Sequence, residues 1–189
     1  MNPLKRTLDL IFAITVGAFV VVPMLLIALI IMIDSRGPIL YWSNRIGYQN
    51  RIFRMPKFRS MRMGAPALAT HLLSDPDQYL TSIGSFLRKT SLDELPQIWS
   101  ILKGEMSLVG PRPALFNQQD LIALRDRYGV QFLVPGITGW AQVNGRDELS
   151  ISEKVKFDVE YLRRQSFLFD LKILWLTFLK VVSRDGISH

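Results

Sequence analysis

The sequence predicts a mixed α/β, mostly helical small domain that carries an N-terminal membrane-embedded helix and interfacial amphipathic helices. An uncharged apolar run of about 24 residues lies between Leu10 and Ile33. Several later segments repeat apolar residues at helical spacing. The chain is 49% hydrophobic yet carries a formal net charge of +7, a combination that is rare in soluble proteins and fits a membrane surface. We therefore expect a membrane helix in residues 1–35 and one compact domain in residues 36–189.

The composition excludes several classes of chemistry. The 189 residues include no cysteine, so disulfides, thiolate nucleophiles and cysteine-ligated zinc are excluded. The excess of basic residues attracts anionic lipid headgroups and negatively charged substrates. A membrane-tethered binding protein for nucleic acid or anionic lipid is therefore the main alternative to an enzyme, and it predicts salt-sensitive binding without turnover.

The run from Leu10 to Ile33 is long enough to enter a bilayer, because as a helix it would measure roughly 36 Å against a hydrocarbon core of about 30 Å. A signal peptide would have a shorter apolar stretch and a small-residue cleavage site, which is missing here. Basic residues flank both ends, with Lys5 and Arg6 before the run and Arg36 and Arg45 after it. A bend at Pro23 together with these flanks favours a re-entrant helix, although a spanning helix also tolerates proline.

The stretch from residue 51 to residue 61 is predicted to be an extended segment interrupted by Pro56. In extended geometry Lys57 and Arg59 lie on one face about 7 Å apart, which suits neighbouring phosphate groups. Solvated strand charges are the alternative interpretation.

Helical spacing of apolar residues predicts packing faces in residues 79–89, 115–128 and 152–165, the last with Val155, Val159 and Leu162 on one stripe. The apolar segment from Phe167 to Val182 is about 16 residues long, which is short for a membrane span. We expect an interfacial helix there, with a buried core helix as the alternative.

Two adjacent acids, Asp93 and Glu94, are the strongest candidates for chemistry, because adjacent carboxylates can divide nucleophile and metal-binding roles. Ser91 and Glu94 also have the spacing of a helix capping box, so the acids could instead complement a helix N-terminus. Pro96 indicates that the continuous helix begins nearer residue 95 and leaves both acids just before it. In that position Arg88 could help to hold a substrate phosphate.

Two further motifs contain candidate anion-binding side chains. Two prolines hold Arg112 in the rigid stretch 106–113, which reduces the entropy lost when the guanidinium binds an anion. A proline-rich loop with a solvated arginine is the alternative. The run 135–146 combines turn glycines with Trp140, Gln142, Asn144 and Arg146, which can stack on and hydrogen-bond a nucleotide.

Together the motifs in residues 57–61, 90–97, 106–113 and 135–146 resemble, in the same order, those of the bacterial sugar transferase family, the monotopic polyprenyl-phosphate phosphoglycosyl transferases. The resemblance runs from about Lys5 to the C-terminal apolar helix. It implies a re-entrant membrane helix, a small mixed α/β catalytic domain on the cytoplasmic face of the bacterial inner membrane, a Mg²⁺ cofactor and an aspartate nucleophile. Val22 replaces a frequent serine of the family, and Asp147 replaces a frequent asparagine.

The resemblance also implies a reaction. Asp93 would attack the β-phosphate of a UDP-sugar, release UMP and form a covalent phosphosugar intermediate, which undecaprenyl phosphate would then displace. Asp93 and Glu94 would hold Mg²⁺, Arg88 and Arg112 would bind phosphates, and residues 142–146 would shape the nucleotide or acceptor site. The product would start a surface glycan or glycoprotein pathway that other glycosyltransferases continue. Direct transfer in one step, with Asp93 only as a metal ligand, is the alternative within enzymes.

Overall fold

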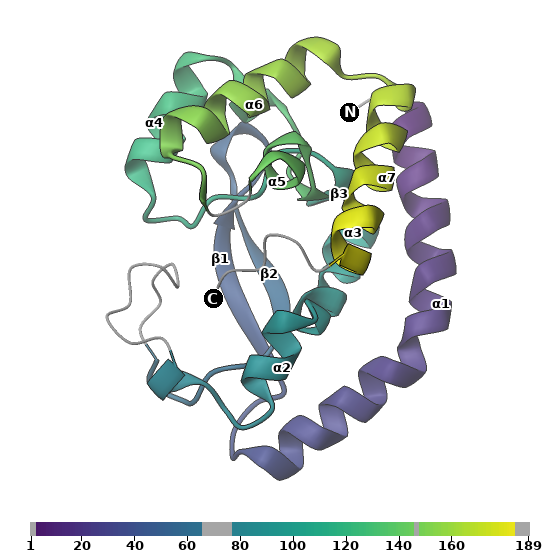
Figure 1. Ribbon diagram of the computed structural model, residues 1–189, viewed down its shortest axis with the longest axis vertical. Helices are drawn as coiled ribbons and strands as arrows, with labels where there is room; N and C mark the ends of the chain where they lie inside the picture. The colour runs from purple at the N-terminus through teal and green to yellow at the C-terminus, as the bar shows by residue number, and fades with distance from the viewer. Residues whose placement is uncertain (1–2, 66–76, 146–147, 184–189) are drawn as a thin grey trace.

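The computed structural model describes residues 3–65, 77–145 and 148–183, and it confirms a mostly helical α/β chain (Figure 1). The helices are α1 (Pro3–Asp34), α2 (Gly84–Lys89), α3 (Ile98–Lys103), α4 (Gln119–Arg127), α5 (Trp140–Asn144), α6 (Ile151–Arg164) and α7 (Phe167–Ser183). The strands are β1 (Leu40–Ile46), β2 (Ile52–Phe58), β3 (Ser107–Val109) and β4 (Gly136–Thr138). Short 3-10 helices occur at Tyr48–Asn50, Asp77–Tyr79, Leu92–Gln97 (η4) and Val130–Phe132.

β1 and β2 form an antiparallel hairpin, which confirms the extended segment expected around residue 56. Tyr41 pairs with Lys57, and Arg45 pairs with Phe53. Directly opposite residues share a face of the sheet and every second residue returns to it, so Lys57 and Arg45 lie on the same face. Pro56 is tolerated because each strand of a two-stranded sheet has a free edge.

β3 and β4 form a short parallel pair that the sequence interpretation missed. Ser107 pairs with Gly136, and the Gly136 N–H donates to the Pro111 carbonyl at 3.0 Å. A Cβ atom at Gly136 would lie 2.1 Å from the Gly110 nitrogen, so the close approach of the two backbones requires glycine. The pair brings the run that begins at residue 135 against the loop that leads to residue 112.

α1 is one continuous helix of 32 residues that contains Pro23, and Figure 1 shows it changing direction along its length. By length and composition it is the one helix of the described residues that could cross a membrane. Its first half packs through Ala13 against a core cluster that includes Ile101 and Met106. Its last turns pack through Ile31 against Phe58, so both halves contact the same domain.

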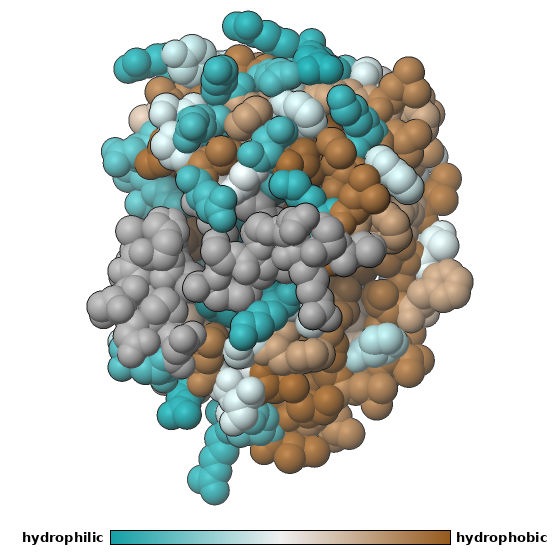
Figure 2. All heavy atoms as spheres, in the orientation of Figure 1, coloured by the Kyte–Doolittle hydropathy of each residue, from teal (hydrophilic) through white to brown (hydrophobic). Residues whose placement is uncertain are grey.

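α1 and α7 expose a continuous apolar surface, which appears as the brown side of the molecule in Figure 2. On α7, Phe169 and Ile173 are buried in the core, whereas Leu168, Trp175 and Phe178 are exposed by 74%, 60% and 58%. One face of α7 therefore belongs to the core, as the buried-helix alternative expects, and the opposite face is apolar and exposed. The position of this helix in a membrane interface stays a prediction.

The other helical segments agree with the sequence in part. α6 matches the predicted segment 152–165, and Val155 is buried as expected. α2 begins only at Gly84, because residues 80–83 follow a separate 3-10 helix. α4 begins at Gln119, since Leu115 instead bridges to Arg45 of β1. Tertiary contacts thus shorten both helices at their N-terminal ends.

Candidate active site

The two acids lie inside η4, directly before α3. The expectation that Asp93 and Glu94 stand just before a helix starting near Leu95 is therefore wrong. Pro96 has no N–H to donate, and the chain around it forms a 3-10 helix before the α-helix begins. Asp93 is 7% exposed, so its carboxylate lies at the floor of the site.

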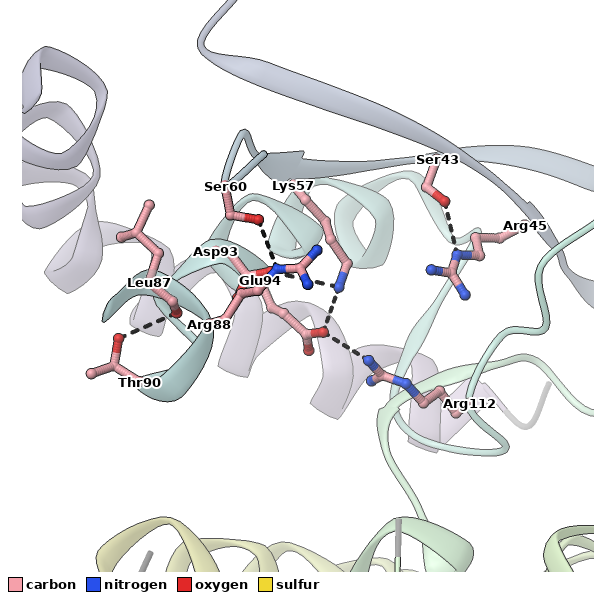
Figure 3. A network of polar contacts seen from close by, with 10 residues as sticks. All are labelled: Ser43, Arg45, Lys57, Ser60, Leu87, Arg88, Thr90, Asp93, Glu94 and Arg112. Atoms are coloured by element: carbon pink, nitrogen blue, oxygen red, sulfur yellow. Dashed lines mark hydrogen bonds and ion pairs between the residues drawn. The ribbon is translucent and has the colours of Figure 1, made fainter. Parts of the chain in front are cut away.

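The capping-box interpretation of the acids is also wrong. Ser91 adopts a left-handed conformation with φ of 56°, and its side chain makes no capping hydrogen bond. The side chain of Glu94 instead turns toward Lys57 and Arg112 (Figure 3). The pair of acids therefore faces cations from elsewhere in the chain rather than its own helix.

Three segments far apart in sequence meet at Glu94. Its Oε1 accepts hydrogen bonds from Lys57 Nζ of β2 at 2.6 Å and from Arg112 Nη2, in the loop after β3, at 2.9 Å. Lys57 Nζ also lies 3.8 Å from Asp93 Oδ2. Glu94 is thus held by two cations, and Lys57 faces both acids.

The two carboxyl groups have different electrostatic environments. Burial raises the pKa of Asp93, and the opposing effect of Lys57 only partly offsets it. Burial also acts to raise the pKa of Glu94, but Arg112 and Lys57 together hold that pKa well below its usual range. Glu94 is therefore a fixed anion, whereas Asp93 is a more basic carboxylate and the better candidate for bond formation.

Arg88, on the last turn of α2, lies next to Asp93 (Figure 3). Its Nε donates to Ser60 Oγ at 3.0 Å, which fixes the plane of the guanidinium. Burial lowers the pKa of Arg88, and the nearby Asp93 opposes this shift. Because an arginine stays protonated at neutral pH, Arg88 adds a positive charge beside the acids.

Arg45 is a further cation at this site that sequence reasoning did not single out as a ligand. Its Nε donates to Ser43 Oγ at 3.0 Å and its Nη1 donates to the Pro113 carbonyl at 3.2 Å. Figure 3 shows the guanidinium on the same side of the hairpin as Lys57 and Arg112. The signal that could have found it is period-two alternation along β1, which places Arg45 on the face that carries Lys57.

Not every predicted ligand joins this cluster. Arg59 is 4% exposed and donates to the carbonyl oxygens of Ser35 and Arg36 at 2.7 and 3.1 Å, so it closes the C-terminal end of α1. Lys57 and Arg59 therefore have different partners, because β2 ends at residue 58 and the alternation of side chains ends with it. Arg146 lies outside the described residues.

Gln142 and Asn144 lie on α5. Gln142 is buried, and neither atom of its amide has a hydrogen-bond partner among the described residues. It lies close to the backbone of Gly110, because a Cβ atom at Gly139 would lie 2.1 Å from the Gly110 oxygen and 2.7 Å from Gln142 Oε1. Asn144 is exposed and donates to the Trp140 carbonyl at 2.7 Å. A buried amide without partners has hydrogen bonds to offer to a ligand.

The sequence predicts that Asp93 and Glu94 bind Mg²⁺. The two acids can form such a site only together with ligands from a bound substrate. The described residues contain no group of three or more side chains of the kinds that bind metals (His, Cys, Asp, Glu). Mg²⁺ commonly uses one or two carboxylates with substrate phosphates and water as its remaining ligands. Asp93 and Glu94 supply those carboxylates, and the surrounding cations can receive the phosphates.

Comparison with known proteins gives a match over almost the whole chain. A family model described as "Bacterial sugar transferase" matches residues 1–184. An undecaprenyl-phosphate glucose phosphotransferase of Komagataeibacter xylinus is 41% identical over 96% of this chain and 36% of its own length. The UDP-glucose:undecaprenyl-phosphate glucose-1-phosphate transferase of Escherichia coli K12 is 40% identical over 94% of this chain and 40% of its own length.

A third relative has nearly the same length as this chain. The uncharacterized sugar transferase EpsL of Bacillus subtilis 168 is 40% identical, over 98% of this chain and 91% of its own length. The chain therefore spans about two fifths of the first two relatives, which contain long additional segments, and nearly all of the third.

Proposed function

The chain belongs to the bacterial sugar transferase family, and from this membership and the charged cluster we propose that it moves a sugar 1-phosphate from a UDP-sugar to undecaprenyl phosphate and releases UMP. The observation that carries the proposal is a pair of acids, the buried Asp93 and the half-buried Glu94, beside cations from three other segments. Transfer between two phosphate-bearing substrates needs this combination, because the nucleophile must approach an anion and the negative charge must be neutralised.

The reaction proceeds in two displacements at one phosphorus atom. A carboxylate oxygen of Asp93 forms a bond to the β-phosphorus of the UDP-sugar, the bond from that phosphorus to the bridging oxygen breaks, and UMP leaves. A phosphate oxygen of undecaprenyl phosphate then attacks the same phosphorus, and the bond to Asp93 breaks. The products are an undecaprenyl diphosphate sugar and the regenerated carboxylate. Covalent catalysis thus divides a difficult reaction into two steps.

The other side chains position and neutralise the reactants. Glu94 is engaged by Lys57 and Arg112, so its role is to orient these two cations rather than to attack. Arg88 carries its positive charge beside Asp93 and stabilises the charge of the transferred phosphate. Gln142 offers amide hydrogen bonds next to the loop that carries Arg112. Asn144 and Arg146 are assigned to the nucleotide or acceptor on the family motif alone.

Magnesium supports this chemistry as a Lewis acid. Asp93 and Glu94 would hold the ion, and a bound ion would neutralise charge on the diphosphate of the donor. Lys57 contacts both acids, and the positive charge of Arg88 acts on Asp93, so both cations help to orient the nucleophile.

The helix α1 enters and leaves the membrane on the cytoplasmic side of the bacterial inner membrane. A helix of 32 residues is about 48 Å long, which exceeds the hydrocarbon core of about 30 Å. In a spanning orientation the two ends of α1 would therefore lie on opposite sides of the membrane. Contacts at both ends of α1 with one domain support the re-entrant alternative: Arg6 bonds the carbonyl of Ile101, and Ile31 packs on Phe58. The exposed apolar face of α7 then lies in the interface.

Transfer assays test the assignment. Detergent-purified protein is incubated with a panel of radiolabelled UDP-sugars, magnesium and undecaprenyl phosphate, and label in the lipid fraction is measured together with UMP. We expect one or a few sugars to give labelled lipid. The exposed Asp120→Asn variant serves as a matched control and keeps wild-type transfer. If the protein transfers no sugar but binds nucleic acid or anionic vesicles in a salt-sensitive way, the proposed enzyme is wrong and the protein is a membrane-tethered binding protein.

A further inference from the structure

The first turns of α1 bond directly to the two segments that carry the active-site side chains. Arg6 donates through Nη1 to the carbonyl of Ile101 at 2.5 Å and through Nη2 to the carbonyl of Leu102 at 2.8 Å. These carbonyls end α3, which continues from the acid-bearing helix η4 without a break. The guanidinium thus satisfies carbonyl groups that have no partner within a helix of this length.

Asp9 contacts the other segment. It is 3% exposed at the start of the long apolar part of α1, and its Oδ1 accepts a hydrogen bond from the Leu108 N–H at 3.2 Å. Leu108 lies in β3, and the loop that carries Arg112 begins two residues later. One face of α1 therefore holds both α3 and β3 by side-chain hydrogen bonds.

A second chain of contacts reaches the same strand through α7. Lys5 forms an ion pair with Asp170. Asp170 Oδ1 accepts from the Tyr161 hydroxyl at 2.7 Å, and this hydroxyl also lies 3.2 Å from the Val109 carbonyl. Burial raises the pKa of Tyr161, so the phenol stays protonated and can donate. Both Leu108 and Val109 of β3 are thus tied to the start of α1.

We propose that Arg6 and Asp9 are positioning residues, which keep the acid-bearing helix η4 in register with the loop that carries Arg112. The proposal rests on the proposed function for its catalytic consequence. The 2.9 Å bond between Glu94 and Arg112 joins these two segments inside the site, and the α1 contacts join the same segments from behind. Insertion of α1 into the membrane and alignment of the site are therefore linked through one helix.

A role in stability alone explains Asp9 poorly. Its Oδ2 is buried with no hydrogen-bond partner among the described residues, and burial of a carboxylate in this condition opposes folding. An apolar residue at this position would avoid the free-energy cost of burying a carboxylate. The bond to Leu108 instead fixes one point on β3, and small misplacements of catalytic groups lower rates strongly.

The test combines turnover with a distance measurement. The chain has no cysteine, so spin labels can be placed only at Lys103→Cys on α3 and Asn117→Cys beyond the Arg112 loop, both at exposed positions. The distance distribution between the labels is measured in lipid nanodiscs for the wild-type background, Arg6→Met, Asp9→Leu and Asp9→Asn. Arg51→Met, an exposed arginine, is the matched control. Membrane content and melting temperature are recorded for each variant.

We expect Arg6→Met and Asp9→Leu to broaden the distribution and to lower turnover about tenfold, with little change in the KM for the UDP-sugar. Asp9→Asn keeps an oxygen that can accept from the Leu108 N–H, so its turnover and distance distribution should match those of the wild type. An unchanged distance distribution in Arg6→Met and Asp9→Leu would overturn the proposal. A tenfold loss of turnover would also overturn it if the melting temperature fell enough for unfolding to account for the loss. If the wild type transfers no sugar while the distribution still broadens, the proposed function fails and the alignment role stands.

Discussion

Two clusters of buried acids and arginines differ in their balance of charge. In the first, Asp158 of α6 accepts from Arg125 of α4 at 2.8 and 3.0 Å, which pairs one acid with one cation. In the second, the pair Asp93 and Glu94 faces more cations than acids, because Lys57, Arg88 and Arg112 act on it. A balanced pair holds two helices together. A cluster with excess positive charge is suited to an anionic substrate.

The acids of the two clusters also respond differently to burial. Burial raises the pKa of Asp158, and the opposing effect of Arg125 is too small to reverse it. Two cations reverse the effect of burial at Glu94, whose pKa falls well below its usual range. Position near two cations, rather than burial alone, therefore separates Glu94 from the acid of the structural ion pair, whereas burial raises the pKa of Asp93 as it does that of Asp158.

The largest expected effect is the loss of transfer in Asp93→Asn. Asparagine has nearly the same shape but cannot form the acyl-phosphate bond to the phosphosugar, so we expect turnover to fall by about 10⁴-fold or more. Transfer of radiolabelled sugar to lipid measures it. The melting temperature should change little, since a buried acid is replaced by a neutral amide. If Asp93→Asn retained a tenth of wild-type turnover, Asp93 would not be the nucleophile.

Disruption of the balanced pair should affect stability instead of chemistry. Arg125→Met leaves Asp158 buried without its cation, which should lower the free energy of unfolding by about 3–5 kcal/mol. Thermal and denaturant unfolding in detergent measure this loss. Asp158→Asn removes the buried negative charge but keeps an oxygen that can accept from Arg125, so it should be less harmful. Equal losses in the two variants would contradict the view that the unpaired carboxylate causes the damage.

A smaller effect is expected for Arg112→Lys. The charge remains, but the guanidinium that bonds Glu94 is replaced by a shorter ammonium without a planar fork. We expect turnover to fall by about 10- to 100-fold with an unchanged melting temperature. Arg51→Lys, at an exposed position of the same chain, controls for the substitution and should be neutral. Full activity of Arg112→Lys would show that a positive charge alone, without the guanidinium, is sufficient at this position.

The opposite pKa shifts predict opposite effects of pH on stability. The pKa of Glu94 is lowered in the folded state, so its contribution is present above the unfolded pKa of about 4.3 and is lost as pH falls through the folded pKa. The pKa of Asp158 is raised, so its contribution is full below about pH 3.9 and is lost as pH rises through the folded pKa.

Melting curves against pH measure these two effects. Glu94→Gln should flatten the acid limb of the stability profile, and Asp158→Asn should flatten the decline at higher pH. If Glu94→Gln and Asp158→Asn changed the pH dependence of stability in the same way, the two clusters would be electrostatically alike, which would contradict the comparison.

Local patterns predicted several parts of the fold. The long apolar run predicted α1, and the apolar spacing around Val155 predicted α6. Residues 51–61 were predicted to be extended, and they contain β2. The parallel pairing of β3 with β4 was missed because each strand has only three residues, and their pairing depends on contact between glycine backbones far apart in sequence. Short non-local pairs leave no periodic signal.

The structure brings some of the predicted site residues together and separates others from them. The adjacent acids and Arg112 could be found because charged residues next to prolines stand out locally. Arg45 was missed as a ligand because its place depends on the register of the hairpin. Arg59 was assigned to phosphate because the end of β2 could not be read from the sequence, and the structure instead gives it the carbonyls that end α1.

The covalent intermediate tests the central claim most directly. Wild-type protein is incubated with the active UDP-sugar and magnesium but without undecaprenyl phosphate, and the intact mass and released UMP are measured. We predict a mass increase of one sugar phosphate, located at Asp93 by peptide mapping, with UMP released in equal amount and no adduct on Asp93→Asn. Release of UMP only when the acceptor is present, with no adduct at any time, would contradict the two-step reaction and establish direct transfer.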